Sequence, residues 1–324
     1  MLASKIFNHH SSEEFTALAL DVFRYQHQNV PVYRAFCEFL KTDPSSIQSI
    51  EKIPFLPIQL YKEQKVISEG HSAQKTFTSS GTTGNITSKH HVVDLELYIH
   101  SFTKAFQLFF GPICDYTILA LLPSYQKREG SSLIYMADTL IKESKNSDSG
   151  FFLNQTETLT ECLLHLESTG KKTLLLGVSY ALLDLIEHHK FELSNTIVME
   201  TGGMKGRRKE MIKEDLHTRL KHGFRVKSIY SEYGMTELLS QAYSKGNGVF
   251  FCPPWMKVMT RDPEDALSWI QGKTGGINVI DLANIYSCSF IATQDLGKVQ
   301  NDGSFEIIGR FDTSDIRGCN LMVL

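Results

Sequence analysis

From residue 76 onward, short apolar runs alternate along the chain with amphipathic runs of helical period. The apolar runs at 116–123, 173–177 and 195–203 predict buried strands, and a stretch that predicts a helix follows each of them. Strands that alternate with helices at this spacing imply βαβ units and a mostly parallel sheet with helices on both faces. The predicted fold class is therefore α/β, with a doubly wound sheet.

After about residue 248 the pattern changes, because apolar runs follow one another without helices between them. Asp302 and Gly303 separate the last two runs and predict a hairpin turn, so this portion is expected to be largely antiparallel. We therefore expect four parts packed together: a helical and extended region at 1–75, an α/β core at 76–247, a smaller, mainly β subdomain at 248–309 and a hinge-like tail at 310–324.

Local signals predict where several helices begin and end. Ser11 and Glu14 have the spacing of a capping box, which predicts a helix start just after Ser11. Pro54 and Pro57 stop any helix and indicate an extended connector. Gly223 comes at the end of a charged helical run and is expected to form the C-cap of that helix.

Composition limits the classes of function. The 33 Lys and Arg residues nearly balance the 36 Asp and Glu residues, which argues against binding nucleic acid or a membrane surface through basic charge. No apolar run is long enough to span a bilayer, and the N-terminus lacks the apolar segment of a secretion signal. The 6 cysteines show no paired spacing, which is typical of reduced thiols. We therefore expect a cytoplasmic enzyme.

A stretch rich in hydroxyl groups and glycine follows the first predicted strand of the core. Such a loop can turn backbone N–H groups and hydroxyls toward a polyphosphate, although no Gly-Lys-Ser/Thr sequence closes it as in a Walker A loop. A Ser/Thr/Gly surface turn is the plain alternative, and density of hydroxyls alone does not decide between the two. The candidate phosphate-binding residues are Ser79, Ser80, Gly81, Thr82, Thr83 and Gly84.

A second motif follows a predicted strand later in the chain. Tyr233, Gly234, Thr236 and Glu237 place an aromatic ring, a point of close approach, a hydroxyl and a carboxylate within one turn. That set suits a purine, a phosphate and Mg²⁺, which prefers few carboxylates together with phosphate oxygens. Taken alone, Glu237 is more simply explained as a carboxylate at a helix N-terminus, where it would interact with the helix dipole.

The two motifs together, SSGTTG followed by YGMTE, resemble those of the adenylate-forming superfamily of acyl- and aminoacyl-activating enzymes. Three further segments fall where that superfamily has its own motifs. The Gly202-Gly203 pair resembles its adenine-binding turn, Thr293-Gln294-Asp295 resembles its ribose clamp, and the segment 309–312 resembles its hinge motif. Within the superfamily the chain is similar to the LuxE-type acyl-protein synthetases, in size and in the segments 53–62, 119–136, 200–210 and 316–324.

The resemblance implies the α/β fold of the superfamily's large domain and the use of ATP and Mg²⁺. It implies that the stretch 79–84 holds the departing phosphates and that Tyr233 stacks on adenine beside the glycines. It further implies that Asp295 and Arg310 hold the ribose. In the same way Thr236 would contact the α-phosphate and Glu237 would hold Mg²⁺, so the nucleotide-binding set includes Gly202, Gly203, Tyr233, Gly234, Asp295 and Arg310.

The sequence also departs from the superfamily. The sequence ends just past the hinge motif, and we therefore expect no counterpart of the mobile C-terminal domain of ordinary members, with its lysine for the α-phosphate. Lys205 or Arg207 is our candidate for the replacement cation, and Tyr125 is the candidate gate of the acyl pocket. LuxE-type proteins pass the acyl group to a cysteine near their own C-terminus, which implies Cys319 as the acceptor.

The predicted function is an ATP-dependent ligase that makes an acyl-AMP from a carboxylic acid, by resemblance a fatty acid, and passes the acyl group to a protein cysteine. An acyl-CoA reductase or acyl carrier protein would be the partner. Three alternatives stay open: a ligase for an aryl or other acid with a carrier-protein or CoA acceptor, a non-catalytic acyl-carrying or scaffold subunit, and an α/β esterase that uses Ser179.

Overall fold

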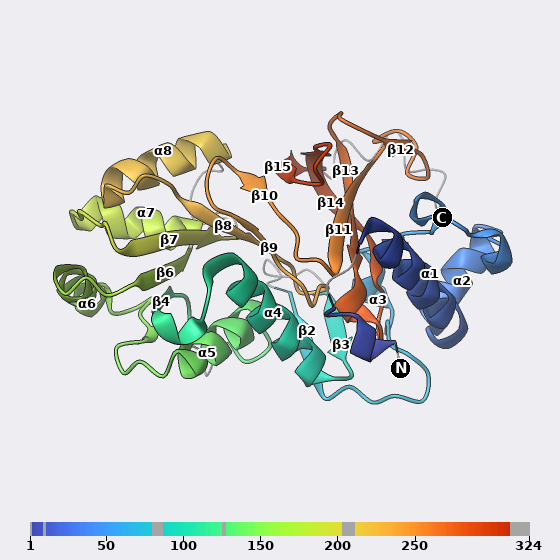
Figure 1. Ribbon diagram of the computed structural model, residues 1–324, viewed down its shortest axis with the longest axis horizontal. Helices are drawn as coiled ribbons and strands as arrows, with labels where there is room; N and C mark the ends of the chain where they lie inside the picture. The colour runs from blue at the N-terminus through green and yellow to red at the C-terminus, as the bar shows by residue number, and fades with distance from the viewer. Residues whose placement is uncertain (1, 9–10, 80–86, 125–127, 203–210, 312–324) are drawn as a thin grey trace.

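A computed structural model gives the structure of residues 2–8, 11–79, 87–124, 128–202 and 211–311. Figure 1 shows an α/β lobe and a β-rich lobe lying side by side, with the strands β2 (Lys75–Thr78) and β3 (Lys89–Val92) between them. No helix in this described part of the chain has the length and apolarity that crossing a bilayer requires.

The α/β lobe is built on a six-stranded sheet in which five neighbouring strands are parallel and the last pairs antiparallel. The two central strands read TILAL and TLLLGV and are buried at every position, because helices cover both faces of a parallel sheet. The predicted doubly wound α/β sheet is confirmed. Its strands, in spatial order, are β5 (Gly150–Phe151), β4 (Thr117–Leu121), β6 (Thr173–Val178), β7 (Thr196–Thr201), β8 (Tyr230–Tyr233) and β9 (Ala242–Ser244).

Five helices surround this sheet. Figure 1 shows α7 (Ser179–His188) and α8 (Lys213–Phe224) along one face, and α4 (Leu95–Phe110) and α5 (Ser132–Ser144) along the other. The remaining helix, α6 (Thr156–Ser168), packs against β6. The helices therefore alternate with the strands as the sequence pattern predicts.

The predicted C-cap at Gly223 is wrong. Gly223 lies inside α8, which continues to Phe224 and ends at Arg225 in a left-handed conformation. A Cβ atom at Gly223 would lie only 2.6 Å from Cβ of Ile186 in α7. The glycine is thus required by the close approach of two helices and not by a change of chain direction.

The β-rich lobe contains a seven-stranded sheet that is antiparallel except at one edge contact. There β1 (Leu56–Pro57), from the proline-containing connector, pairs parallel with β14, which the sequence pattern did not indicate. Asp302 and Gly303 form the expected hairpin turn between β14 and β15. The other strands are β10 (Val249–Phe250), β11 (Met256–Arg261), β12 (Trp269–Ile270), β13 (Gly275–Asp281), β14 (Phe290–Val299) and β15 (Phe305–Arg310).

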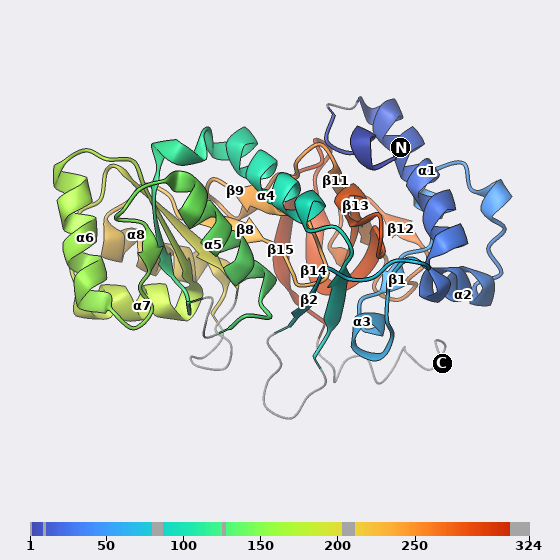
Figure 2. The same cartoon turned by 90° about the horizontal axis from the view of Figure 1, so that it is seen from below.

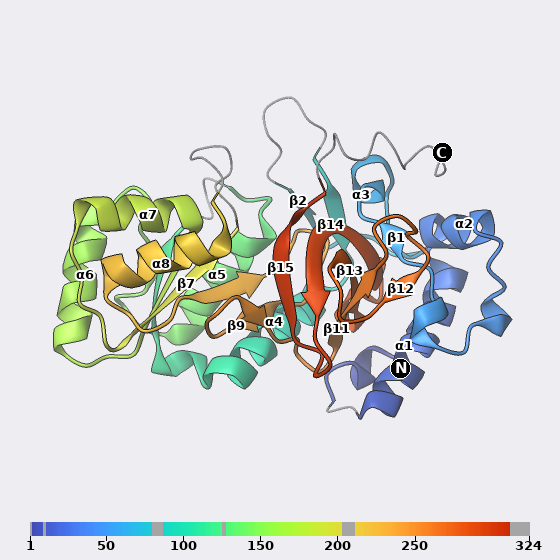
Figure 3. The ribbon, with the colours of Figure 1, turned by 90° about the horizontal axis from the view of Figure 1, so that it is seen from above.

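The N-terminal helices α1 (Ser12–Asn29) and α2 (Pro31–Phe39) cover the outer side of this lobe, as Figure 3 shows. The predicted capping box is confirmed, because Ser11 accepts from the Glu14 N–H and the Glu14 carboxylate accepts from the Ser11 N–H. The four-part division of the chain stays a prediction. Short helices complete the described chain: α3 (Leu60–Glu63) and the 3₁₀ turns η1 (Ala3–Lys5), η2 (Pro44–Ser46), η3 (Ile50–Lys52), η4 (Ile113–Asp115) and η6 (Leu282–Asn284).

Strands β2 and β3 form a separate two-stranded sheet, which projects between the lobes in Figure 2. The pairing extends past the strands, because the N–H of Ser79 donates to the carbonyl of Ser88 at 3.1 Å. The side chains of Ser88 and His90 are buried. This hairpin places Ser88 and His90, which come after the hydroxyl-rich stretch, against the turn that follows β8.

Candidate active site

Residues that follow the first motif approach the second motif where the β2–β3 hairpin contacts the turn after β8. The side chain of Ser88, beside the hydroxyl-rich stretch, lies close to the Glu237 carboxylate and acts to lower its pKa. Nδ1 of His90 lies 2.8 Å from the carbonyl oxygen of Thr236, although 146 residues separate them in the chain. The hydroxyl of Ser79 accepts a hydrogen bond of 3.0 Å from the N–H of Ser88. Ser88 thus links Ser79, a predicted phosphate-binding residue, to the turn that carries Thr236 and Glu237.

Glu237 lies in a turn, with its side chain only 5% exposed. Burial raises the pKa of the Glu237 carboxyl, while Ser88 and the more distant charges of Arg310 and Lys62 act in the opposite direction. No helix begins among the described residues 234–241, so the plain explanation of Glu237 as a helix N-terminal carboxylate is wrong. A buried carboxylate beside hydroxyl groups is instead suited to a phosphate-bound cation.

Asp295 joins the two lobes at this site. Its Oδ2 accepts a hydrogen bond of 2.9 Å from the Tyr233 hydroxyl, and its Oδ1 accepts one of 2.9 Å from Nε of Arg310. Asp295 and Arg310 lie opposite each other in the β14–β15 pair, which fixes this contact. The negative charge of Asp295 raises the pKa of Arg310, so the guanidinium stays protonated. The structure therefore brings together three residues of the predicted nucleotide-binding set.

The ring of Tyr233 is buried at the end of β8. It packs edge-on against Phe305, with ring centroids 5.4 Å apart, and against Phe250 at 5.9 Å. Burial, followed by the charge of Asp295, raises the pKa of Tyr233 well above its ordinary value. The hydroxyl is thus a hydrogen-bond donor at any physiological pH, and the stacking of this ring on adenine stays a prediction.

Gly234 follows Tyr233 at a point of very close packing. A Cβ atom there would lie 2.4 Å from Oε1 of Glu232, a buried carboxylate that also accepts a hydrogen bond from the Thr201 hydroxyl. Thr201 ends β7 and Glu232 lies in β8, so this bond links the two strand ends that carry the predicted adenine-binding residues. Only a residue without a side chain leaves room for this link.

Gly202 comes directly after β7, and its carbonyl oxygen accepts a hydrogen bond of 2.6 Å from the Ser179 hydroxyl. The same hydroxyl lies 3.2 Å from the buried carboxylate of Glu200. Ser179 therefore donates to a carbonyl and a carboxylate and has no histidine base among these contacts, whereas a serine nucleophile requires one. The geometry does not support the esterase alternative, and Ser179 instead holds Gly202 in place.

Glu200 is the centre of a charged cluster beneath Gly202. Its Oε1 lies 3.3 Å from Nζ of Lys213 and 3.5 Å from Nε2 of His217. Burial alone would raise the pKa of Glu200, but the contacts with His217, Lys213 and Ser231 outweigh it and lower the pKa to about 2. Glu200 is therefore ionised at neutral pH and paired with the N-terminal part of α8.

The structure leaves several predicted residues untested. No group of three or more His, Cys, Asp or Glu side chains in the described part of the chain could hold a metal ion by itself. Glu237 alone is consistent with Mg²⁺ carried by a nucleotide, because that ion keeps water and phosphate ligands. Predicted site residues that lie outside the described residues are Ser80, Gly81, Thr82, Thr83, Gly84, Gly203, Lys205 and Cys319, together with Tyr125 and Arg207.

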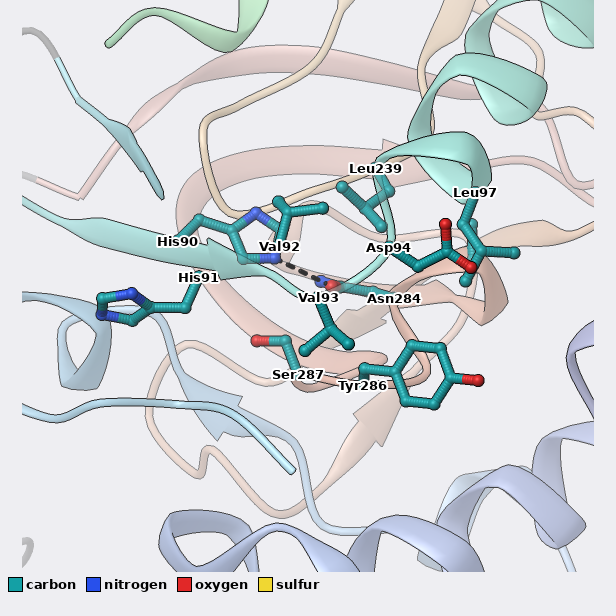
Figure 4. Close-up of a pocket in the computed structure, with 11 residues that line it drawn as sticks. His90, His91, Val92, Val93, Asp94, Leu97, Leu239, Asn284, Tyr286 and Ser287 are labelled. Atoms are coloured by element: carbon teal, nitrogen blue, oxygen red, sulfur yellow. Dashed lines mark hydrogen bonds between the residues drawn. The ribbon is translucent and has the colours of Figure 1, made fainter. Parts of the chain in front are cut away.

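Two polar residues at the site were missed by sequence reasoning. His90 and Asn284 contact each other in the lining of a small pocket, with His90 Nε2 and Asn284 Oδ1 at 2.9 Å (Figure 4). The sequence offers His90 only as half of the His90-His91 pair, which lacks the spacing of a zinc site. Its position on the buried face of a strand next to the hydroxyl-rich stretch was the available signal. No signal in the sequence pointed to Asn284, because it lies in a turn of the β13–β14 connection.

The fold is that of the large domain of adenylate-forming enzymes. The chain superposes on an open conformation of 2-hydroxyisobutyryl-CoA ligase in complex with 2-HIB-AMP and CoA with a TM-score of 0.68, at 14% identity, covering 94% of this chain and 72% of that one. ATP-bound MatB from Rhodopseudomonas palustris gives a TM-score of 0.55 at 18% identity, covering 72% of this chain and 47% of that one.

The family model described as "Acyl-protein synthetase, LuxE" matches residues 5–324, and the chain belongs to this family. The predicted resemblance is thus confirmed. A long-chain-fatty-acid–luciferin-component ligase from Photorhabdus luminescens is 35% identical over 68 residues, which are 21% of this chain and 58% of that relative. The match therefore spans a little over half of that relative's length.

Proposed function

We propose that this chain is an ATP-dependent acyl-activating ligase that forms an acyl-AMP from a fatty acid and passes the acyl group to a protein cysteine. Family membership and the name of the Photorhabdus relative support the choice of acid. The observation that carries the proposal is the contact of Ser88 and His90 with the Thr236–Glu237 turn, next to the Asp295–Arg310 pair. This contact supports the proposal, because hydroxyls, a carboxylate and a candidate ribose-binding residue would then belong to one site.

In the first step MgATP and the acid are the substrates. A carboxylate oxygen of the acid attacks the α-phosphorus, the bond to the β-phosphate bridge oxygen breaks, and pyrophosphate leaves with the electron pair. The magnesium ion that accompanies ATP neutralises charge on the phosphates. The carboxylate of Glu237 would hold that ion, the hydroxyl of Thr236 would bind an α-phosphate oxygen, and Asp295 would accept from the ribose hydroxyls. The residues contribute by positioning and charge neutralisation.

The developing charge on the α-phosphate also needs a cation from the protein. Lys205, beside the glycine turn, remains our candidate from the sequence. Arg310 is a second source of positive charge, because its field acts on the Glu237 carboxylate and its side chain is 75% exposed at the site. If Lys205 supplies this charge, Lys205→Ala should slow adenylation more than Arg310→Ala does, and the order should be reversed if Arg310 supplies it.

In the second step a thiolate attacks the acyl carbon, the bond from that carbon to the phosphate oxygen breaks, and AMP leaves. Cys319 is the proposed acceptor, and the nucleophile is its deprotonated form. From Cys319 the acyl group would pass to a partner, either an acyl-CoA reductase or an acyl carrier protein. A cytoplasmic location accords with a reduced thiol at this step.

The proposal is tested by ATP–pyrophosphate exchange with a panel of fatty and aryl acids, followed by intact-mass measurement of the protein. We expect exchange and a covalent acyl adduct with a fatty acid. Glu237→Gln should lose both, whereas Cys319→Ser should keep exchange and lose the adduct. Exchange with aryl acids alone would overturn the choice of substrate. Absence of exchange with every acid would instead favour an acyl-carrying scaffold.

A further inference from the structure

The turn after β8 is held almost entirely through its main chain. His90 lies against the carbonyl oxygen of Thr236, and the side-chain amide of Asn284 donates to the carbonyl oxygen of Glu237 at 2.7 Å. Both side chains are about 1% exposed, so neither contact is shared with solvent. Two successive carbonyl groups, one on each predicted catalytic residue, are therefore fixed by buried partners from distant parts of the chain.

The amide side of the same turn is fixed by Asp281. Its Oδ2 accepts from the N–H groups of Leu239 at 2.7 Å and Ser240 at 2.9 Å. Asp281 is also the N-cap of η6, the 3₁₀ turn that ends at Asn284. The short turn η6 and its N-cap, in the β13–β14 connection, thus bind the N–H groups of Leu239 and Ser240 and the carbonyl group of Glu237.

The N-terminal region anchors the short turn η6. The amide of Gln26, in α1, donates to the main-chain carbonyl oxygens of Asn284 at 3.0 Å and Ile285 at 2.9 Å. On the other side, the ring of Tyr61 packs edge-on against His90 with centroids 5.7 Å apart. His90 and Asn284 contact each other, so all of these groups form one connected, buried network.

We infer that His90 and Asn284 are positioning residues that aim the Thr236 hydroxyl and the Glu237 carboxylate at the nucleotide by fixing their main-chain carbonyls. This role rests on the proposed function. A turn closed by one main-chain hydrogen bond, from the Leu238 N–H to the Met235 carbonyl oxygen at 3.1 Å, has little stiffness of its own. A displacement of 1 Å at a reacting group can cost a large factor in rate. The network supplies the stiffness that the local sequence lacks.

The test uses two readouts on the full chain: hydrogen–deuterium exchange of a peptide covering 234–241, and the kinetics of pyrophosphate exchange. Asn284→Ala removes the donor to Glu237. Ser287→Ala is the matched control, because Ser287 is buried in the same pocket and bonds Tyr61 and Val66, not the turn. We expect Asn284→Ala to speed deuterium uptake of the turn and to lower kcat about tenfold, with KM for ATP changed little. Ser287→Ala should do neither.

A pair of conservative variants tests His90. An asparagine amide nitrogen occupies the place of Nδ1, whereas a glutamine amide nitrogen occupies that of Nε2. His90→Asn should therefore keep the donor to Thr236 and most of kcat, and His90→Gln should lose both. If Asn284→Ala does not fold, Asn284→Asp, which keeps the size but lacks the N–H, replaces it.

Deuterium uptake of the turn that is the same in the unmodified chain, Asn284→Ala and Ser287→Ala would overturn the inference. So would equal kcat values for His90→Asn and His90→Gln. If the unmodified protein exchanges no pyrophosphate with any acid, the proposed function fails. The deuterium measurement then decides the positioning role by itself.

Discussion

The Tyr233 hydroxyl donates to Oδ2 of Asp295 at 2.9 Å, across a separation of 62 residues in the chain. Tyr233 ends a strand of the parallel sheet, and Asp295 lies in a strand of the antiparallel sheet, so this bond joins the two lobes. Because Arg310 binds the other carboxylate oxygen, the Asp295 side chain has one orientation. The proposed ribose contact therefore depends on how the lobes pack together.

Tyr233→Phe should weaken this junction. Loss of one buried hydrogen bond is expected to lower the free energy of unfolding by about 1 kcal/mol. The KM for ATP should rise several-fold while kcat changes little, because the variant affects the orientation of Asp295 and not the reacting groups. Urea unfolding and exchange kinetics measure the two effects. Tyr230→Phe, on the same strand, is the control, and an equal change in KM for that variant would contradict the prediction.

Glu237→Gln should separate stability from activity. Burial raises the pKa of Glu237, so the folded state binds its proton more tightly than the unfolded state, and ionisation at neutral pH costs stability. The contribution of this group therefore falls as pH rises through the raised pKa. We expect Glu237→Gln to be at least as resistant to urea as the unmodified protein at pH 7, yet to lose about a hundredfold or more in exchange. A marked drop in unfolding free energy would argue for a structural role.

Glu200 should give the opposite pH dependence. Its folded pKa of about 2 lies below the ordinary value of 4.5, so its stabilising contribution is complete above pH 4.5 and is lost as pH falls toward 2. Between pH 7 and pH 3.5 this group should account for a loss on the order of 1 kcal/mol. The Glu200→Gln variant should not lose this part of the unfolding free energy over the same pH interval.

The comparison of unmodified protein with Glu200→Gln isolates this group, since other carboxylates titrate in both proteins and cancel. Urea midpoints at pH 7 and pH 3.5 provide the measurement. If both proteins lose the same free energy over this interval, the ion pairing with Lys213 and His217 does not lower the pKa as inferred.

Gly223→Ala tests the packing of α7 on α8. Alanine is the better helix former by up to about 1 kcal/mol, but the new Cβ would meet Ile186 at 2.6 Å, and overpacking costs about 1 to 3 kcal/mol. We expect a net loss of stability in urea unfolding. In a chain that already carries Ile186→Ala, the contact is removed, and Gly223→Ala should then raise the free energy of unfolding. If Gly223→Ala alone raised the free energy of unfolding, the close approach of the two helices would not explain the glycine.

Much of the fold could be predicted because it depends on local patterns. Strands buried on both faces need continuous apolar runs, so the segments that became β4 and β6 stand out in the sequence. The motif residues Tyr233, Asp295 and Arg310 were also found, and the structure brings them into contact. The roles of Cys319 and Lys205 stay predictions.

The errors share a physical cause. Gly223 lies in a sequence context typical of a helix C-cap, yet the glycine is required by the close approach of Ile186 in another helix. Glu237 has the sequence context of a helix start, yet His90 and Asn284 hold its turn open by taking the main-chain carbonyls. Neighbours in the chain could not reveal either partner.

By itself, the amino-acid sequence determined which segments form strands and helices, because periodicity and capping act within a few residues along the chain. It also supplied the hydroxyls, glycines and carboxylates of the two motifs. Only the tertiary structure decided that Ser88 meets Glu237, that Tyr233 holds Asp295, and that a short turn near Asn284 supports the site. These contacts depend on sheet register and lobe packing, which arise from burial of the whole core.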